Sequence, residues 1–538
     1  MHKAVSLFTL AAAVIAGAWW WLGRPIPMPP SPLASGEKLY CVSYAPFRGQ
    51  QTPLDLSTRI EPWQIDEDLA LLAKLTDCVR IYSVDFGLDR VPEIAERHGL
   101  KVLLGLWVSS HADRTKYQVD TGIALARRFP NVVRAVIVGN EVLLRGEVAP
   151  EALANLIRTV KSQVTAPVTY ADVWEFWLRH RELAAVTDFV TVHILPYWED
   201  HPIAAHEAAN HVDSIRKHVV SAFAGKEVLI GEVGWPSAGR MRSGALPSPA
   251  NQARVVHDIL ARGKRENVRV NIIEAFDQRW KRYQEGTVGG RWGVITDPPR
   301  AQKFEWGAPV SNHPLWRWQA AGGVVFAALV FGAPFAMRRF APWAQEPTLD
   351  RWIAISVAAA VSGVLIGWTI ENIPLESLGL GGWIRSLAFA SLAAVAPIVC
   401  SAALAANVSL PAFARLIGPK DERVKGWLPR ALGWLFLALC ILAVQSALAL
   451  AFDPRYRDFP FAPLTCAVVP VLLVSFLVPP TQGERPMAET VAAIALALAA
   501  AAIAVNEGFN NWQAIWCCAA LATVALTLAR ARLARGLE

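Results

Sequence analysis

The fold is decided by one stretch of sequence, VVRAVIVGNE at residues 132–141. Residues 132–138 form a nearly continuous apolar run, which is typical of a parallel strand covered on both faces. Glu141 comes soon after that run, so we expect its carboxylate at the C-terminal end of the strand, where parallel α/β sheets and barrels place catalytic groups. A second interpretation is that Glu141 only caps the helix after it.

Strand and helix patterns alternate on both sides of this stretch. Short apolar runs predict strands at 39–44, 78–83, 101–107, 132–138, 167–171, 189–193, 227–230 and 270–275. Between them, apolar residues near helical spacing predict helices such as 65–75, 121–129, 151–162, 201–220 and 251–264. Eight β/α units in about 270 residues predict an α/β fold of the (β/α)₈ TIM barrel type, with a doubly wound sheet as the alternative.

The second half of the chain has a different composition. The whole chain is 54% hydrophobic with a mean hydropathy of +0.30, which is high for a soluble protein. The excess is local, because long apolar runs occupy 318–337, 352–370, 384–409, 428–452, 462–478, 488–505 and 512–529. We therefore predict an all-α transmembrane helical domain over residues 315–530, with 462–478 as its weakest span because that run is short and contains Pro463 and Pro470.

The first 37 residues predict a membrane anchor and a spacer. Residues 1–24 hold an apolar run that ends in three tryptophans, close to the ~20 residues that a span needs. An uncleaved anchor is favoured, and a signal peptide cleaved near 32–35 is the alternative. Either one would export the soluble half of the chain. Residues 25–37 are a proline-rich linker, and residues 531–538 are predicted to form a basic cytoplasmic tail.

Charge and cysteine content bear on location. With the soluble domain outside, twelve Lys and Arg residues of the membrane half fall inside and three outside, so the net charge of +7 indicates membrane orientation and not a nucleic-acid partner. This predicts a multi-pass protein of the inner membrane, with eight spans including the anchor and an extracytoplasmic soluble domain. Cys41 and Cys78 are the only cysteines before the membrane half. They form a disulfide if their strands are neighbours, or are two buried thiols.

A second carboxylate comes after another predicted strand. Glu232 lies in GEVGWPS at residues 231–237, after the strand at 227–230. Glu141 ends the fourth strand and Glu232 the seventh, so in a closed barrel the two face each other across the mouth. An acid that protonates the leaving oxygen and a nucleophile that attacks the anomeric carbon are what glycosidic cleavage requires.

These motifs resemble a known family. VGNEV at 138–142 and GEVGWPS at 231–237 resemble the two signatures of glycoside hydrolase family 17, the β-1,3-glucanase family. VRIY at 79–82 adds to this resemblance, and EAFDQRWK at 274–281, with 289–294, is similar to the eighth-strand region of bacterial members. The resemblance covers about residues 38–300 and places the catalytic domain at 38–305. It implies a retaining β-1,3-glucanase or glucanosyltransferase with Glu141 as acid/base and Glu232 as nucleophile. Plant members have an acidic residue where Gln278 stands.

Further side chains at strand ends are candidates for substrate binding. Asn140 can hydrogen-bond the 2-hydroxyl of the sugar, and Glu141 is expected to have a raised pKa through burial near a second carboxylate and rings such as Trp198 or Trp235. The remaining candidates are Tyr44, Tyr82, Trp107, Tyr170, His193, Tyr197, Trp235, Glu274 and Lys281. The alternatives are ordinary packing for the rings and a surface ion pair for Glu274 with Lys281.

Other chemistries have no motif behind them. The sequence contains no HExxH, no P-loop and no GxGxxG after a strand, so we expect no metal and no cofactor. The expected partners are a β-glucan and the lipid bilayer, and a glucan synthase or export protein is an open question. A non-catalytic glycan-binding module of a membrane complex or transporter is the alternative, against which the two intact glutamates argue. Hydrolysis and transfer to a sugar share the same carboxylates, so the sequence leaves that choice open.

Overall fold

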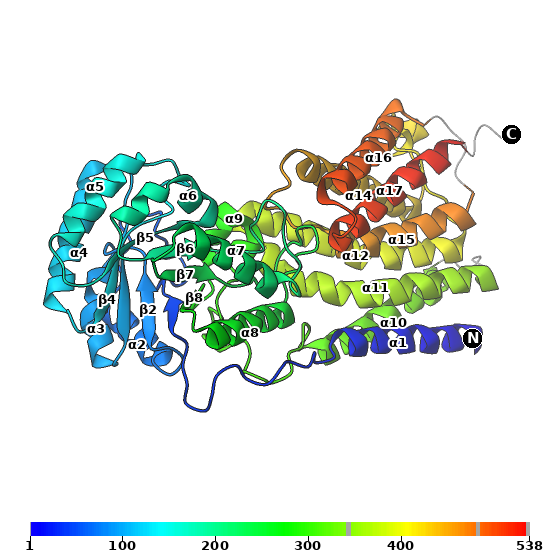
Figure 1. Ribbon diagram of the computed structural model, residues 1–538. Coiled ribbons are helices and arrows are strands. Elements are labelled where there is room, and N and C mark those ends of the chain that lie inside the picture. Colours follow the sequence, from blue (N-terminus) through cyan, green and yellow to red (C-terminus); the bar gives the residue numbers. More distant parts are fainter. Residues whose placement is uncertain (1, 341–345, 480–484, 534–538) are drawn as a thin grey trace. The chain divides into compact units, whose positions relative to one another are not determined.

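The computed structural model describes residues 2–340, 346–479 and 485–533 (Figure 1). The chain divides into two compact units, Ile26–Val310 and the rest of the chain on either side of it. Residues 534–538 of the predicted basic tail lie outside the described residues.

The unit Ile26–Val310 is a closed barrel of eight parallel strands in sequence order, because β8 pairs with β1. The predicted (β/α)₈ barrel is confirmed, and the doubly wound sheet is excluded because an open sheet has two edge strands. The strands are β1 (Cys41–Ser43), β2 (Cys78–Ile81), β3 (Lys101–Leu106), β4 (Val133–Asn140), β5 (Val168–Val173), β6 (Val190–His193), β7 (Val228–Val233) and β8 (Val270–Ile272).

Helices alternate with the strands and surround them (Figure 1). They are α2 (Pro62–Leu72), α3 (Val91–Arg97), α4 (Ala112–Arg128), α5 (Pro150–Lys161), α6 (Trp174–Arg179), α7 (Ala208–Ala222), α8 (Pro249–Glu266) and α9 (Arg282–Gly289). In α5 the buried residues are Leu153, Ala154, Ile157 and Val160. Their spacing of three or four residues gives the helix one apolar face, which it buries against the core.

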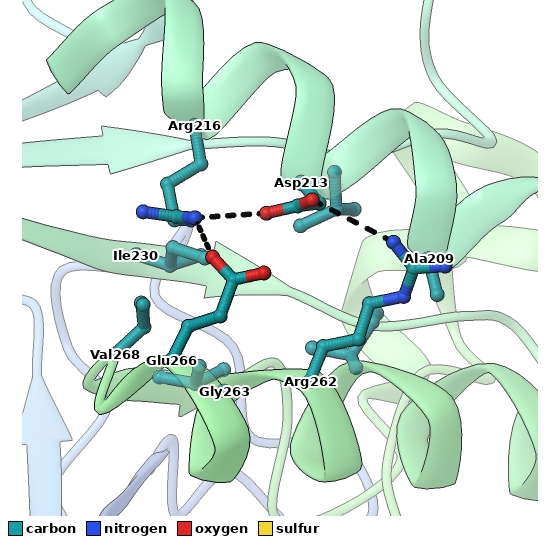
Figure 2. A pocket seen from close by; sticks show the side chains of 11 residues that line it. Ala209, Asp213, Arg216, Ile230, Arg262, Gly263, Glu266 and Val268 are labelled. Carbon is teal, nitrogen blue, oxygen red and sulfur yellow. Dashed lines mark hydrogen bonds and ion pairs between the residues drawn. The ribbon is translucent and has the colours of Figure 1, made fainter.

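Ion pairs join the middle of α7 to the C-terminal end of α8. Arg216 of α7 contacts Asp213 at 2.8 Å and also Glu266 of α8, around a small pocket whose floor is apolar (Figure 2). Arg262 of α8 approaches Asp213 to 3.6 Å. Each charge therefore has an opposite partner, and we assign this cluster a structural role.

The barrel interior contains a small apolar cluster and a disulfide. Cys41, Cys78, Leu103, Ala135, Ile137, Ala171 and Leu229 pack together inside the strands. Because β1 and β2 are neighbours, Cys41 lies opposite Cys78, and the two form a disulfide with a Cα–Cα distance of 4.4 Å. The structure thus selects the paired state from the two that the sequence left open.

The second unit consists of long apolar helices. They are α1 (His2–Leu22), α10 (Trp316–Phe340), α11 (Leu349–Glu376), α12 (Gly379–Ala406), α14 (Trp427–Phe452), α15 (Phe461–Leu477), α16 (Met487–Glu507) and α17 (Trp512–Leu533). Within the described residues, seven of these are long and apolar enough to cross a membrane. The exception is α15, whose 17 residues reach about 26 Å, short of the ~30 Å of a hydrocarbon core. The span predicted at 462–478 is thus a helix, but below spanning length.

Glycines allow α1, α10 and α11 to approach closely. A Cβ on Gly323 of α10 would lie 2.2 Å from the carbonyl oxygen of Gly363 of α11, and a Cβ on either glycine would clash with Ile15 of α1. Ile15 and Trp19 are fully buried at this contact. Small residues at helix crossings are the usual means of close packing where no hydrophobic effect drives association. The N-terminal apolar run therefore packs as one of the helices of this unit.

Candidate active site

Glu141 and Glu232 meet at the mouth of the barrel. Glu141 comes directly after β4, and Glu232 lies near the C-terminal end of β7. One oxygen of each carboxylate lies within 4.8 Å of the other, and one nitrogen of His193 lies within the same distance of both. The expectation that the fourth and seventh strands bring these two groups together is met by the geometry.

The backbone around Glu141 has an unusual conformation. Glu141 has a φ of +51°, which costs a residue with a side chain on the order of 1–3 kcal/mol. The turn is held from β5, because Glu141 N–H donates to the Ala171 carbonyl at 2.8 Å and Leu143 N–H donates to the Tyr170 hydroxyl at 3.0 Å. The next helix, α5, begins only at Pro150. The interpretation of Glu141 as a helix cap is therefore wrong.

Arg80 of β2 ties both glutamate motifs together. Its Nη1 donates to the Gly231 carbonyl at 2.7 Å and to Glu232 Oε1 at 3.2 Å, and its Nη2 donates to Asn140 Oδ1 at 2.5 Å. Arg80 is buried, so the carboxylate of Glu232 compensates a charge that water does not reach. Because Asn140 accepts through its oxygen, it presents its amide nitrogen as a donor.

Tyr82 holds the same oxygen of Glu232. Its hydroxyl lies 2.8 Å from Glu232 Oε1 and 2.9 Å from Ser43 Oγ, and Asn271 donates to that Ser43 oxygen at 2.8 Å. Burial, together with the charge of Glu232, raises the pKa of Tyr82 well above its ordinary value. Tyr82 therefore stays protonated and donates to the carboxylate.

His193, the last residue of β6, lies between the two carboxylates. Its Nδ1 is 2.8 Å from Glu141 Oε1, and its Nε2 is 3.2 Å from Arg80 Nη1 and 3.6 Å from Glu232 Oε1. The ring has no exposed surface. His193 was predicted to contact the sugar, and in the structure it contacts the two glutamates.

The pKa of Glu141 differs from the expectation. Burial opposes ionisation of Glu141, but the hydrogen bond and electrostatic interaction with His193, together with the positive charges of Arg145 and Arg80, outweigh it and hold the pKa of Glu141 below its ordinary value. The expectation of a raised pKa is therefore wrong for this structure. The aromatic rings proposed to raise it do not dominate, since Trp235 is buried and its indole donates to the Leu246 carbonyl at 3.0 Å.

Glu141, His193 and Glu232 are of the types that bind a divalent metal, and their ligand atoms are close enough together for one ion. The Arg80 guanidinium, however, is 3.2 Å from both His193 Nε2 and Glu232 Oε1. A divalent cation bound by those two atoms would face this fixed positive charge. The donor set therefore fits a guanidinium better than a metal ion.

The predicted sugar-binding rings fall into two groups. Tyr44, Tyr170, Tyr197 and Trp235 have 1% exposure or less, and this placement does not support stacking on a glucosyl ring. The three tyrosine hydroxyls instead contact Asp68, Asp172 and the Arg240 carbonyl.

Trp107 and Trp198 keep part of their surface exposed. The Arg145 guanidinium lies 4.3 Å from the ring centre of Trp107, and Trp198 stacks on Trp292 with ring centres 6.3 Å apart. Both indoles are thus held by a neighbour.

Glu274 and Lys281 form a buried ion pair. Lys281 Nζ lies 2.9 Å from Glu274 Oε1, Glu274 is 1% exposed, and its Oε2 has no hydrogen-bond partner among the residues that the structure describes. The alternative of a surface ion pair is therefore wrong. Burial raises the pKa of Glu274 to about 7, although Lys281 opposes the shift.

Several residues near the site were not predicted. Arg145 contacts the Asn140 carbonyl and donates to Glu147 at 2.7 Å, and Asp172 lies beside Tyr170 on β5. Glu285 of α9 has a pKa raised by burial and by the charges of Glu141 and Glu232, against the opposing charge of Lys281. Asp172 could have been found as an acidic residue at a strand end. Glu285 gave no such signal, because its helix reaches the mouth only through the tertiary fold.

The pKa of Glu274 leads to a test of stability. Its folded value of about 7 exceeds the unfolded value of about 4.3, so its stabilising contribution is fully present below about pH 4 and is lost as the pH rises through 7. Glu274→Gln cannot titrate. We expect the stability difference to shift in favour of the variant by about 3 kcal/mol between pH 4 and pH 8. Thermal unfolding of full-length wild type and Glu274→Gln between pH 4 and pH 8 measures this difference in stability, and Glu151→Gln, at an exposed position, is the control. A difference that does not change with pH would contradict the buried state of Glu274.

Comparisons with known proteins identify the barrel. Residues 41–293 match the model of the BtgE/BtgC glycoside hydrolase domain. The chain is 29% identical over 238 residues to the Aspergillus fumigatus protein named "Probable beta-glucosidase btgE", covering 43% of this chain and 41% of that protein. It is 24% identical over 300 residues to the "Probable glucan endo-1,3-beta-glucosidase btgC" of the same species, covering 47% and 41%.

A solved structure of similar sequence is the glycoside hydrolase family 17 β-1,3-glucanosyltransferase of Rhizomucor miehei. It is 27% identical, with a TM-score of 0.42, over 50% of this chain and 98% of that one. The chain spans about two fifths of the length of the curated relatives that it matches. The match of residues 41–293 to a glycoside hydrolase domain model confirms the family resemblance predicted from the two glutamate motifs.

Proposed function

We propose that this chain is a retaining glycoside hydrolase or transglycosylase that acts on β-1,3-glucan. The observation that carries the proposal is the separation of Glu141 and Glu232, whose nearest oxygens are within 4.8 Å. Retaining pairs are about 5–5.5 Å apart, whereas inverting pairs leave room for a water at about 6.5–9.5 Å. The names of the similar proteins, a β-glucosidase, a glucan endo-1,3-β-glucosidase and a β-1,3-glucanosyltransferase, support the substrate class.

The contacts of the two glutamates suggest which one is the nucleophile and which is the acid/base. Oε1 of Glu232 is held by Tyr82 and Arg80, so Oε2 is the atom that attacks the anomeric carbon. Glu141 gives its proton to the glycosidic oxygen as the bond from that oxygen to the anomeric carbon breaks. In the second step Glu141 takes a proton from water or a sugar hydroxyl, whose oxygen displaces Glu232 from the anomeric carbon. The amide nitrogen of Asn140 is the donor proposed for the 2-hydroxyl.

Azide tests the two roles. We expect Glu141→Ala and Glu232→Ala to lower activity on laminari-oligosaccharides by on the order of 10³-fold or more, with Glu151→Ala as an exposed carboxylate control.

The azide products separate the two roles on a dinitrophenyl β-laminaribioside, whose leaving group needs no acid. With Glu141→Ala, the product should be a β-glycosyl azide, because azide attacks the glycosyl-enzyme. It should give Glu232→Ala an α-glycosyl azide, because azide replaces the nucleophile. Normal turnover by Glu232→Ala would refute its role as nucleophile.

Product size tests the substrate and the acceptor. The full-length chain, in detergent, is incubated with β-1,3-gluco-oligosaccharides of one length and the products are sized. Tethering beside a membrane, where a growing or exported glucan chain would lie, leads us to expect products longer than the substrate, formed by transfer. Shorter products alone would indicate hydrolysis. Binding without any cleavage would support the alternative, a non-catalytic glycan-binding module of a membrane complex or transporter.

We further propose that the chain is anchored in the inner membrane with its barrel on the extracytoplasmic side. The spanning-length helices, the charge bias of the predicted loops and the Cys41–Cys78 disulfide support this location, because disulfides persist in oxidising compartments. A glucan synthase or export protein would be the natural neighbour of such a domain.

Thiol counting tests the location. The chain has seven cysteines, and all but Cys41 and Cys78 are free. If the barrel is extracytoplasmic, maleimide added to protein denatured directly from cells should label five thiols, and seven after reduction. Seven labelled thiols without reduction would indicate a cytoplasmic barrel.

A further inference from the structure

We propose that His193 is a positioning residue that Arg80 holds as the Nδ1–H tautomer, so that it donates to Glu141 and stabilises the ionised form that acts as base. The inference rests on the proposed function, since it concerns how the acid/base changes role between the two steps. His193 lies outside both glutamate motifs, so neither motif predicts this role. The imidazole of His193 lies between the Arg80 guanidinium, which can only donate hydrogen bonds, and the Glu141 carboxylate, which accepts them when ionised.

The tautomer is determined by Arg80. A guanidinium can only donate hydrogen bonds, so His193 Nε2, which lies 3.2 Å from Arg80 Nη1, must accept. The neutral ring then carries its proton on Nδ1, and Glu141 Oε1 accepts that proton at 2.8 Å. A carboxylate is the best acceptor for such a donor when it is ionised.

The surroundings keep the ring in this orientation. His193 has no exposed surface, so water cannot exchange places with either partner. Residue 231 must be small, because a Cβ there would lie 3.1 Å from His193 Cδ2 and 2.4 Å from the side chain of Thr191. His193 also pairs in register with Glu232 on the neighbouring strand, which sets its height at the barrel mouth.

Other charges act on Glu141 from several elements. Arg80 of β2 and Arg145 from the turn after β4 favour its ionised form, as His193 does. Asp172 of β5 and Glu285 of α9 act in the opposite sense, since each shares an electrostatic interaction with Glu141. Glu232 is a further negative charge within 4.8 Å until the sugar esterifies it. His193 is the group among these that donates a hydrogen bond directly to the Glu141 carboxylate.

This arrangement favours the second step of the reaction over the first. The first step needs Glu141 protonated, and a donor that stabilises its anion restricts that step to lower pH. The second step needs Glu141 ionised, and the same donor assists it. Loss of the Nδ1 donor should therefore extend the first step to higher pH and slow the second step.

The test compares His193→Asn with His193→Gln, which differ in where they place a donor. The side-chain nitrogen of Asn can occupy the position of Nδ1, whereas that of Gln reaches towards Nε2. The full-length chain is used with two substrates. On laminari-oligosaccharides, whose leaving oxygen needs the acid, we expect Gln to move the alkaline limb of kcat/KM upward by about one pH unit. On a dinitrophenyl β-laminaribioside, whose first step needs no acid so that the second step limits kcat, we expect Gln to lower kcat about tenfold. His193→Asn should keep the alkaline limb of kcat/KM and the value of kcat close to those of the wild type. Azide should restore kcat in the Gln variant, because azide attacks without giving up a proton.

The inference is overturned if the Gln variant keeps the wild-type alkaline limb, if Asn and Gln behave alike, or if azide does not restore kcat. Thermal unfolding checks that each variant is folded. If the His193→Gln variant does not fold, His193→Ala takes its place, and added free imidazole should then restore the alkaline limb of kcat/KM to its wild-type position. The azide products of Glu141→Ala and Glu232→Ala test the proposed function separately, so either proposal can fail while the other stands.

Discussion

The site depends on one buried cation, the Arg80 guanidinium. Taking such a charge out of water costs several kcal/mol unless opposite charge and hydrogen-bond acceptors surround it. The barrel supplies them from three other strands, as Glu232 and the Gly231 carbonyl, Asn140, and His193. Removing Glu232 would take away the negative charge that compensates the buried guanidinium, and removing Asn140 would take away the acceptor of Nη2. The two glutamate motifs, about ninety residues apart, are therefore held as one unit by the need to compensate Arg80.

Barrel closure brings these acceptors within reach. Parallel strands end on the same side, so the ends of β2, β4, β6 and β7 surround one mouth once β8 pairs with β1. Each side chain comes from a rigid strand or from the residue just after one, and the backbone at Glu141 is fixed by hydrogen bonds from β5. Positive φ at Glu141 is tolerated because that support determines the turn. The local strain thus places the Glu141 carboxylate where a regular strand would not.

The helical unit depends on a different constraint. An α-helix bonds its backbone groups within itself, so a long apolar run by itself predicts where each helix lies. Which helices touch depends on shape, and Gly323 and Gly363 let the backbones of α10 and α11 meet beside Ile15 of α1. The α15 helix shows the limit of length as a criterion, since it is apolar throughout but too short to span by itself.

The sequence by itself determined the barrel, the eight apolar helices and the places of Glu141 and Glu232 at strand ends, because strand periodicity, apolar length and a carboxylate after a buried strand are local properties. Only the tertiary structure decided the Cys41–Cys78 disulfide, the burial of Glu274 and the enclosure of rings such as Tyr44 and Tyr197. It also reversed the expected pKa shift of Glu141, because that shift depends on His193 and Arg80, which lie far from Glu141 along the chain. The pKa of a group depends on all the charges and hydrogen bonds near it in space. The sequence shows only which residues are adjacent along the chain.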